Sequence, residues 1–249
     1  MPKRPLTLIH TSDVHLESDT FGRGEEGLSY RRRIQGAFHK VVDMVCEKKA
    51  DLFLIAGDLF DSNRVPESGV EFVNAELRRI PCPVILIPGN HDCYDHRSIY
   101  KKADFTLAGS HVHTLTEEEG RTITFPELQA TVWGKGLVEH DPAFRPLAGV
   151  PARLDDWWHI GMAHGYFVEE EGFQRSSPVT PEEIDQSGLD YLAMGHVHVF
   201  NDLSQGSTTS CYPGTPAPLY MGVDDGGSVA VVTLDPEKGV AITQQKVVL

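Results

Sequence analysis

Three short apolar runs alternate with two amphipathic segments in the first hundred residues, and this order restricts the possible folds more than any other feature. The runs, with the polar residues that end them, lie at 6–13, 51–58 and 83–92. Segments 30–50 and 67–80 carry apolar residues at helical spacing. Wholly apolar strands separated by helices are typical of a covered parallel sheet. The sequence therefore predicts an α/β fold.

The second half of the chain is richer in strand and turn signals. It ends in two apolar stretches joined by "DPEKG" at 235–239, which predicts a closing hairpin over 228–249. No internal repeat, low-complexity tract or clear linker divides the 249 residues. We therefore expect a single domain over 1–249, without a capping domain.

The composition is that of a soluble globular protein, with 40% hydrophobic and 23% charged residues. No apolar run approaches the roughly 18 residues of a membrane span. The start of the chain turns polar too soon for a signal peptide. Its four cysteines are scattered without a C-x-x-C pair, so we expect reduced thiols and a cytoplasmic location.

Side chains that can bind metal follow each of the first three strands. Asp13 and His15 stand in "TSDVH", Asp58 and Asp61 in "AGDLFD", and the third strand ends in "PGNHD" with Asn90, His91 and Asp92. The carboxyl ends of neighbouring parallel strands open onto a common crevice, where α/β sheets bind their ligands. We expect Asp92 to anchor its own turn.

Two later strand-like runs add imidazoles. His164 ends "GMAHG", and "LAMGHVHVF" sets His196 and His198 one residue apart behind a glycine. Such a pair can be packed core, a solvated loop end, or two ligands of one cluster. The same spacing in "HVH" at 111–113 lacks the glycine and the apolar run, so we interpret that segment as a surface strand.

Together these positions offer more donors than one tetrahedral zinc ion uses. The set suits two ions of about five or six ligands each, and mixed oxygen and imidazole donors without thiolate favour manganese, iron or zinc. The alternative is that they are turn residues that share no site. The donors are Asp13, His15, Asp58, Asn90, His164, His196 and His198.

The motifs D-x-H, G-D-x-x-D, G-N-H-D, H-G and G-H-x-H, in this order, resemble the calcineurin-like metallophosphoesterase superfamily. The match covers about residues 6–200. Within the superfamily, "HTSDVHL", "AGDLFDSNRVP", "PGNHD" and "CYPGTPAPLY" (211–220) are most similar to SbcD-type nuclease subunits of DNA repair complexes. The resemblance implies a four-layer sandwich: two mixed β-sheets flanked by helices, with the metal centre at the strand ends.

The resemblance also implies a dinuclear centre with two divalent ions, most often Mn²⁺ and alternatively Fe or Zn. One ion would be held by Asp13, His15, Asp58 and His198, and the other by Asp58, Asn90, His164 and His196. The implied reaction is hydrolysis of a phosphodiester by a metal-activated hydroxide. His91 would protonate the leaving oxygen or stabilise the developing charge, and Asp61 would orient His91, although repair nucleases often have histidine at the position of Asp61.

Three functions remain open from the sequence. The first is a nuclease-like phosphodiesterase, in which Arg64 and Arg97, each close to a ligand loop, would contact substrate phosphate. The second is a phosphoesterase for a small, cyclic-nucleotide or lipid-linked substrate, and the third is a non-catalytic interaction scaffold. The formal charge of −14 argues against a protein that grips long nucleic acid. Nothing in the sequence supports the ATPase partner of SbcD-type subunits.

Overall fold

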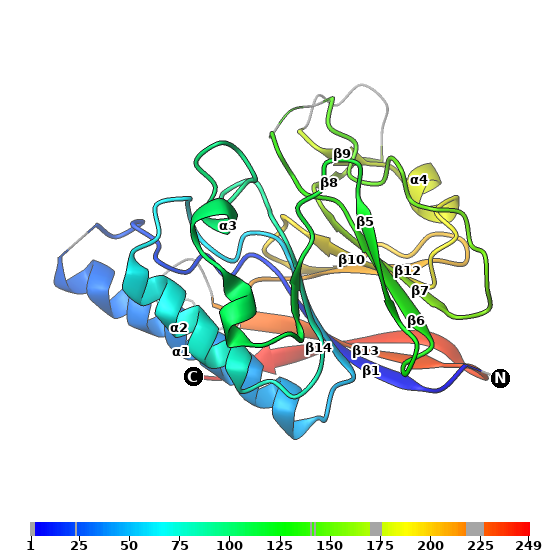
Figure 1. Ribbon diagram of the computed structural model, residues 1–249, viewed down its shortest axis with the longest axis horizontal. Coiled ribbons are helices and arrows are strands. Elements are labelled where there is room, and N and C mark those ends of the chain that lie inside the picture. Colours follow the sequence, from blue (N-terminus) through cyan, green and yellow to red (C-terminus); the bar gives the residue numbers. More distant parts are fainter. Residues whose placement is uncertain (1–2, 23, 140, 142, 170–175, 218–226) are drawn as a thin grey trace.

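Two six-stranded sheets pack face to face and form the centre of the molecule (Figure 1). The computed structural model describes residues 3–22, 24–139, 141, 143–169, 176–217 and 227–249. A hydrophobic cluster that includes Leu54, Ile85, Val132 and Ile160 fills the space between the sheets. The α/β architecture predicted from the sequence is confirmed.

The first sheet contains the three strands predicted near the start of the chain. They pair in parallel, and the sheet is completed on one side by the predicted C-terminal hairpin, whose first strand pairs antiparallel with β1. The order across the sheet is β14 (Gly239–Val247), β13 (Gly227–Asp235), β1 (Leu6–Thr11), β2 (Leu52–Ala56), β3 (Val84–Ile87) and β4 (Val112–Thr114).

The second sheet has parallel strands in its middle and antiparallel strands at its edges. Its order is β11 (Phe200–Asp202), β12 (Thr209–Pro213), β10 (Tyr191–Gly195), β7 (Trp158–His164), β6 (Ala130–Gly134) and β5 (Arg121–Phe125). A small parallel pair, β8 (Tyr166–Phe167) and β9 (Pro178–Val179), lies beside it.

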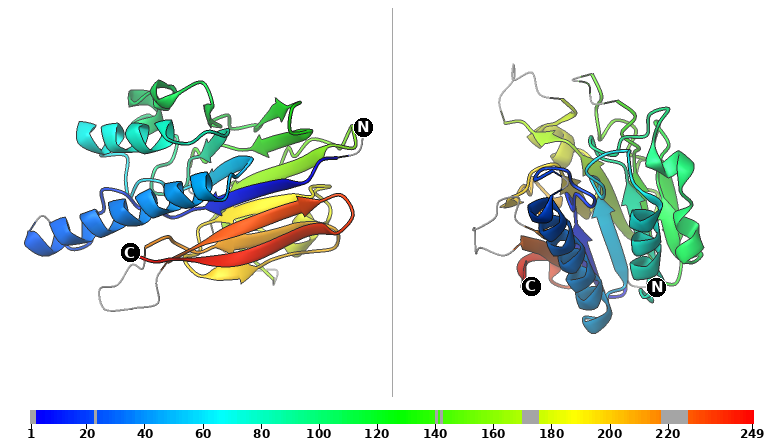
Figure 2. Two further views of the ribbon diagram at one scale, coloured as in Figure 1. Left: turned by 90° about the horizontal axis from the view of Figure 1, so that it is seen from below. Right: turned by 90° about the vertical axis from the view of Figure 1, so that its left-hand side faces the viewer.

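Two helices cover the outer face of the first sheet (Figure 2). α1 (Glu25–Glu47) begins earlier than the predicted 30–50 segment, because Glu25 and Glu26 place negative charge at its N-terminus, where the helix dipole favours it. α2 (Glu67–Arg78) matches the second predicted segment. The shorter helices are α3 (Ile99–Lys102), the 3₁₀ turn η1 (Phe105–Ala108) and α4 (Pro181–Asp185).

The outer face of the second sheet is closed by α4 and its neighbouring loops, around a third hydrophobic cluster that contains Ile184, Leu192 and Met194. Helices, sheet, sheet, and helix with loops therefore form the four layers implied by the resemblance. The histidine pair at 111–113 lies at the edge of the first sheet, where His113 belongs to β4. Among the described residues, no helix is both long and apolar enough to cross a lipid bilayer.

Candidate metal centre

The predicted donors lie where strands of both sheets end and the chain turns. The backbone φ angle is positive at Asp13 (53°), His15 (54°), Asp58 (52°) and His196 (109°). Few non-glycine residues adopt this region, and such strain gathers at functional sites. Here the turns bring side chains from β1, β2 and β10 toward the same place.

The first group of donors joins residues that lie 183 positions apart in the sequence. Nε2 of His15 lies 3.2 Å from Nε2 of His198, and Nε2 of His198 lies 3.5 Å from Oδ1 of Asp13. Oδ2 of Asp13 accepts hydrogen bonds from the Ser12 hydroxyl and, at 3.0 Å, from the amide of His196. Oδ1 of Asp13 therefore faces the other donors and could bind a metal ion.

The second group surrounds the amide oxygen of Asn90. Nε2 of His164 lies 3.0 Å from that oxygen, and Nδ1 of His196 lies 2.7 Å from it. Nδ1 of His164 is bound to the carbonyl of Ala56 at 2.8 Å, which turns Nε2 toward Asn90. His196 therefore presents Nδ1, whereas His164 presents Nε2.

Asp58 lies between the two groups. Its Oδ2 is 3.3 Å from Nε2 of His164 and 4.0 Å from Nε2 of His15. Its Oδ1 accepts a hydrogen bond from the amide of His91 at 2.8 Å. This carboxylate is therefore the one that could face two ions at once.

Glycines allow the loops to approach this closely. A Cβ atom on Gly89 would overlap the Asp58 carboxylate and lie 2.5 Å from the Asp58 amide nitrogen. A Cβ atom on Gly57, whose φ is 90°, would likewise overlap the ring of His164. The packing of these loops thus depends on positions without side chains.

The charges of the cluster favour a cation. Burial disfavours the charged form of His164, but the carboxylates of Asp58 and Asp13 outweigh it and raise its pKa to about 9. Burial also opposes charge on Asp13, yet the imidazoles of His198, His164 and His15 hold its pKa well below its usual range. Buried carboxylates thus depend on nearby positive charge.

The donor set fits divalent metal ions. Oδ1 of Asp13 is buried and has no hydrogen-bond partner among the described residues, although buried carboxylate oxygens are ordinarily paired. Among the described residues, three sets of ligand atoms lie within 4.8 Å of one another: Asp13 with His15 and His198, Asp58 with His164 and His196, and His15 with Asp61 and His91. Oxygen and imidazole donors suit Mn²⁺, Fe²⁺ or Zn²⁺.

His91 lies at the open rim of the cluster. Its side chain is 43% exposed, and its ring packs edge-on against that of His15 at 4.6 Å between centroids. Nδ1 of His91 lies 3.0 Å from the main-chain carbonyl of Asp61 and 3.8 Å from the Asp61 carboxylate. The carbonyl is therefore the nearer partner of His91.

Asp92 ties the loops after β2 and β3 together. Its buried carboxylate accepts from the amides of Gly89 and Phe60 and from the Tyr100 hydroxyl, at 2.8, 3.1 and 2.7 Å. Burial and the neighbouring Asp58 carboxylate raise the pKa of Asp92 to about 6. The residue anchors its turn, as the sequence predicted.

Two contacts to the cluster were not predicted from the sequence. The hydroxyl of Thr215 donates to the main-chain carbonyl of Asp13 at 2.8 Å, and the ring of Tyr166 packs edge-on against His196 at 4.4 Å. Thr215 belongs to the motif at 211–220, and this motif is the sequence feature that could have pointed to it. Residues 218–220 of the motif lie outside the described residues.

The two predicted substrate arginines lie in different surroundings. Arg64 lines a hollow of about 560 Å³ together with Glu17, Asp19 and Arg31. Arg31 is held by the carbonyls of Ser18 and Gly22, at 3.2 and 3.1 Å. The exposed Arg97 donates from Nε to the ring of His96 at 3.1 Å.

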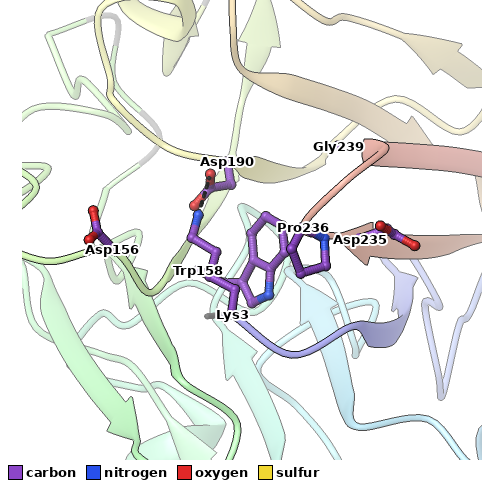
Figure 3. A pocket seen from close by; sticks show the side chains of 7 residues that line it. All are labelled: Lys3, Asp156, Trp158, Asp190, Asp235, Pro236 and Gly239. Atoms are coloured by element: carbon purple, nitrogen blue, oxygen red, sulfur yellow. Dashed lines mark hydrogen bonds and ion pairs between the residues drawn. The ribbon is translucent and has the colours of Figure 1, made fainter. Parts of the chain in front are cut away.

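A larger cavity, of about 700 Å³, lies at the opposite ends of the strands that carry the donors (Figure 3). Trp158 begins β7, and Asp190 precedes β10. The amino group of Lys3 lies 4.0 Å from the ring centroid of Trp158 and 3.2 Å from the Asp190 carboxylate. The chain's own lysine thus occupies the aromatic face of this cavity.

A family model described as calcineurin-like phosphoesterase matches residues 6–200. The chain belongs to this family. The recognition made from the five motifs is confirmed, and the described residues include groups of His and Asp that could hold metal ions.

Curated relatives agree with this assignment. The chain is 29% identical to the uncharacterized metallophosphoesterase YhaO of Bacillus subtilis over 84% of its own length and 52% of that protein. It is 27% identical to the DNA double-strand break repair protein Mre11 of Aeropyrum pernix, over 89% of this chain and 55% of that one. The chain thus spans about half the length of the curated relatives it matches.

A solved structure shows the same fold. The crystal structure of TT1561 of Thermus thermophilus superimposes with a TM-score of 0.57 at 12% identity, covering 98% of this chain and 100% of that one. At such low identity the likeness concerns the fold alone.

Proposed function

We propose that this protein is a dinuclear metal-dependent phosphodiesterase whose substrates are DNA or nucleotide phosphodiesters, in the manner of an SbcD-like exonuclease. The observation that carries the proposal is the position of Asp58 between two groups of donors. Two ions held on either side of Asp58 would be placed to stabilise both the attacking and the leaving oxygen of an in-line displacement at phosphorus.

One ion would be held by Asp13, His15, Asp58 and His198, and the other by Asp58, Asn90, His164 and His196. When bound, the pair would supply a hydroxide nucleophile at neutral pH and neutralise the phosphoryl oxygens. Mn²⁺ is our first choice of metal, because the donors are carboxylate, amide and imidazole without thiolate.

His91 would act as the catalytic residue that donates a proton to the leaving alcohol. Its ring lies at the exposed rim, so it can contact substrate, while its main-chain amide remains bound to Asp58. The carbonyl of Asp61 accepts from Nδ1 and leaves Nε2 to face the substrate. A proton donor placed in this way contributes about 10²- to 10⁴-fold to a rate.

Arg64 and, less directly, Arg97 are proposed to bind phosphate groups of the substrate. Arg64 lines a hollow beside the loop after β2, where its guanidinium could reach a bound phosphate. The similarity to Mre11 proteins of DNA repair favours a nucleic-acid substrate. The charge of −14 favours the second candidate, a small phosphodiester, because a negative surface repels long polyanions.

We further infer that residues 1–249 form one domain, since the C-terminal hairpin pairs with the first strand of the same sheet. All four cysteines are free, which supports a reducing, cytoplasmic location.

Three substrates assayed with Mn²⁺ separate these candidates: single-stranded DNA, bis-p-nitrophenyl phosphate and a cyclic nucleotide. Hydrolysis of DNA supports the nuclease function. Turnover of the small diesters with no action on DNA would reject it in favour of the second candidate, and inertness toward all three would reject phosphodiester hydrolysis.

The role of His91 is tested by His91→Ala. We expect Mn²⁺ content to stay at the wild-type level, because the main-chain amide that binds Asp58 survives the substitution. Turnover of bis-p-nitrophenyl phosphate is expected to fall by at least about 100-fold. Unchanged turnover would remove the assigned role.

A further inference from the structure

The carboxylate of Asp61 lies nearer to a metal-site histidine than to His91. Its Oδ1 is 3.1 Å from Nδ1 of His15 and 3.8 Å from Nδ1 of His91. The 3.1 Å contact between Nδ1 of His15 and Asp61 is an ion-pair contact whose alignment falls short of a hydrogen bond, and Nδ1 has no hydrogen-bond partner elsewhere among the described residues. The side chain of His15 is only 3% exposed, so its ring cannot turn to water for a partner.

The loops that carry these two residues are fixed against each other by main-chain hydrogen bonds. Leu16 and Phe60 form a parallel bridge, the amide of Leu16 donates to Leu59 at 2.9 Å, and the amide of Asp61 donates to Leu16 at 3.0 Å. The contact between the Asp61 carboxylate and His15 therefore follows from paired backbones.

The two nitrogens of His15 face different neighbours. Nε2 points into the donor cluster, 3.2 Å from His198 and 4.0 Å from Asp58. Nδ1 faces Asp61 outside the cluster. In metal sites, a carboxylate on the far nitrogen fixes the tautomer and orientation of the ring and makes the ligating nitrogen more basic.

We propose that the Asp61 carboxylate is a positioning residue for His15, holding the proton on Nδ1 so that Nε2 faces the metal, whereas His91 is positioned by the main-chain carbonyl of Asp61. The inference rests on the proposed function, because it concerns the same centre. One residue thereby serves both histidines through different atoms, and a side-chain substitution separates the two roles.

The experiment uses Asp61→Ala and Asp61→Asn with Asp43→Ala as the matched control. Asp43 is also a partly exposed carboxylate, with a side chain 24% exposed against 25% for Asp61, but it lies on α1 and pairs with Arg79. Titration calorimetry with Mn²⁺ measures affinity, turnover of bis-p-nitrophenyl phosphate at saturating Mn²⁺ measures chemistry, and nitrogen NMR of the metal-free protein reports the His15 tautomer at a pH where the ring is neutral.

We expect both Asp61 variants to bind one of two Mn²⁺ ions about 10- to 100-fold more weakly, the range for loss of such a partner. At saturating Mn²⁺ their turnover should return to within about threefold of wild type, since the Asp61 carbonyl remains. In the NMR spectrum, the Nδ1–H tautomer of His15 should lose its dominance. Asp43→Ala should match wild type in all three measurements.

Unchanged Mn²⁺ affinities combined with a turnover as low as that of His91→Ala would overturn the inference and show that the carboxylate serves His91. An unchanged His15 tautomer would overturn it as well. A wild-type protein that binds no pair of Mn²⁺ ions would instead refute the proposed function, and the tautomer measurement would still decide whether Asp61 sets the His15 ring.

Discussion

Replacing Gly89 with alanine tests whether the close approach of two loops builds the metal centre. The added methyl would overlap the Asp58 carboxylate and lie 2.5 Å from its amide nitrogen and 2.7 Å from its Cγ. Since non-bonded carbon contacts need roughly 3.5 Å, the carboxylate must move by about 1 Å.

That displacement removes the hydrogen bond from the His91 amide to Asp58, which measures 2.8 Å. A hydrogen bond to a charged group contributes about 1.5–3 kcal/mol. Because Asp58 faces both groups of donors, we expect both Mn²⁺ affinities to fall by about 10- to 100-fold, at about 1.4 kcal/mol for each factor of ten.

Titration calorimetry with Mn²⁺ gives the affinities, and urea unfolding of the metal-free protein gives the stability. Gly36→Ala, within α1, is the matched control. A Cβ atom at Gly36 would contact only the side chain of Leu249 among the described residues, at an ordinary van der Waals distance of 3.6 Å. In a helix interior this control should stabilise the protein by about 0.5–1 kcal/mol. Wild-type Mn²⁺ affinity in Gly89→Ala would refute the reasoning.

Two further predictions concern the stability of the fold. His10 is fully buried beside the Tyr191 hydroxyl, and burial lowers its pKa to about 3. Between about pH 3 and 6.5 the imidazole is therefore protonated in the unfolded chain but not in the folded protein. The free energy of unfolding should rise with pH over this range, by up to about 1.4 kcal/mol per pH unit. Urea unfolding across this range should show a shallower slope for His10→Asn, and equal slopes would contradict the assignment. Mn²⁺ at about 100 times its dissociation constant should add about 2.7 kcal/mol to the free energy of unfolding, or roughly 5–10 °C to the melting temperature. Asp13→Asn should lose most of this gain. An equal gain in the variant and in wild type would contradict the assignment of Asp13 as a ligand.

The sequence predicts the strand ends well because the chemistry there is local. An apolar run followed by turn residues and donors marks Asp13, Asp58 and Asn90 without knowledge of the rest of the chain. The start of α1 was misplaced because residues 25–29 lack the apolar periodicity on which the prediction relied, although Glu25 and Glu26 suit a helix N-terminus.

Contacts between distant segments could not be predicted from the sequence. The distance from the Asp61 carboxylate to His15 depends on how two strand-end loops pair. The hydrogen bond from Thr215 to Asp13 joins residues 202 positions apart. The resemblance assigned Asp61 to His91, and only the paired loops reveal that its carboxylate is closer to a different ring.

The pairing of β1 with β13 bears on how this protein is made. During synthesis, the first strand emerges long before its neighbour at Gly227–Asp235. Until then one edge of the nascent sheet has no partner, and contacts so far apart in sequence form slowly. His198 and Thr215 likewise reach the centre only after all the residues that precede them have been synthesised. A product truncated before His198 would therefore carry an open sheet edge and lack a proposed metal ligand, and we expect it to be inactive and prone to aggregate.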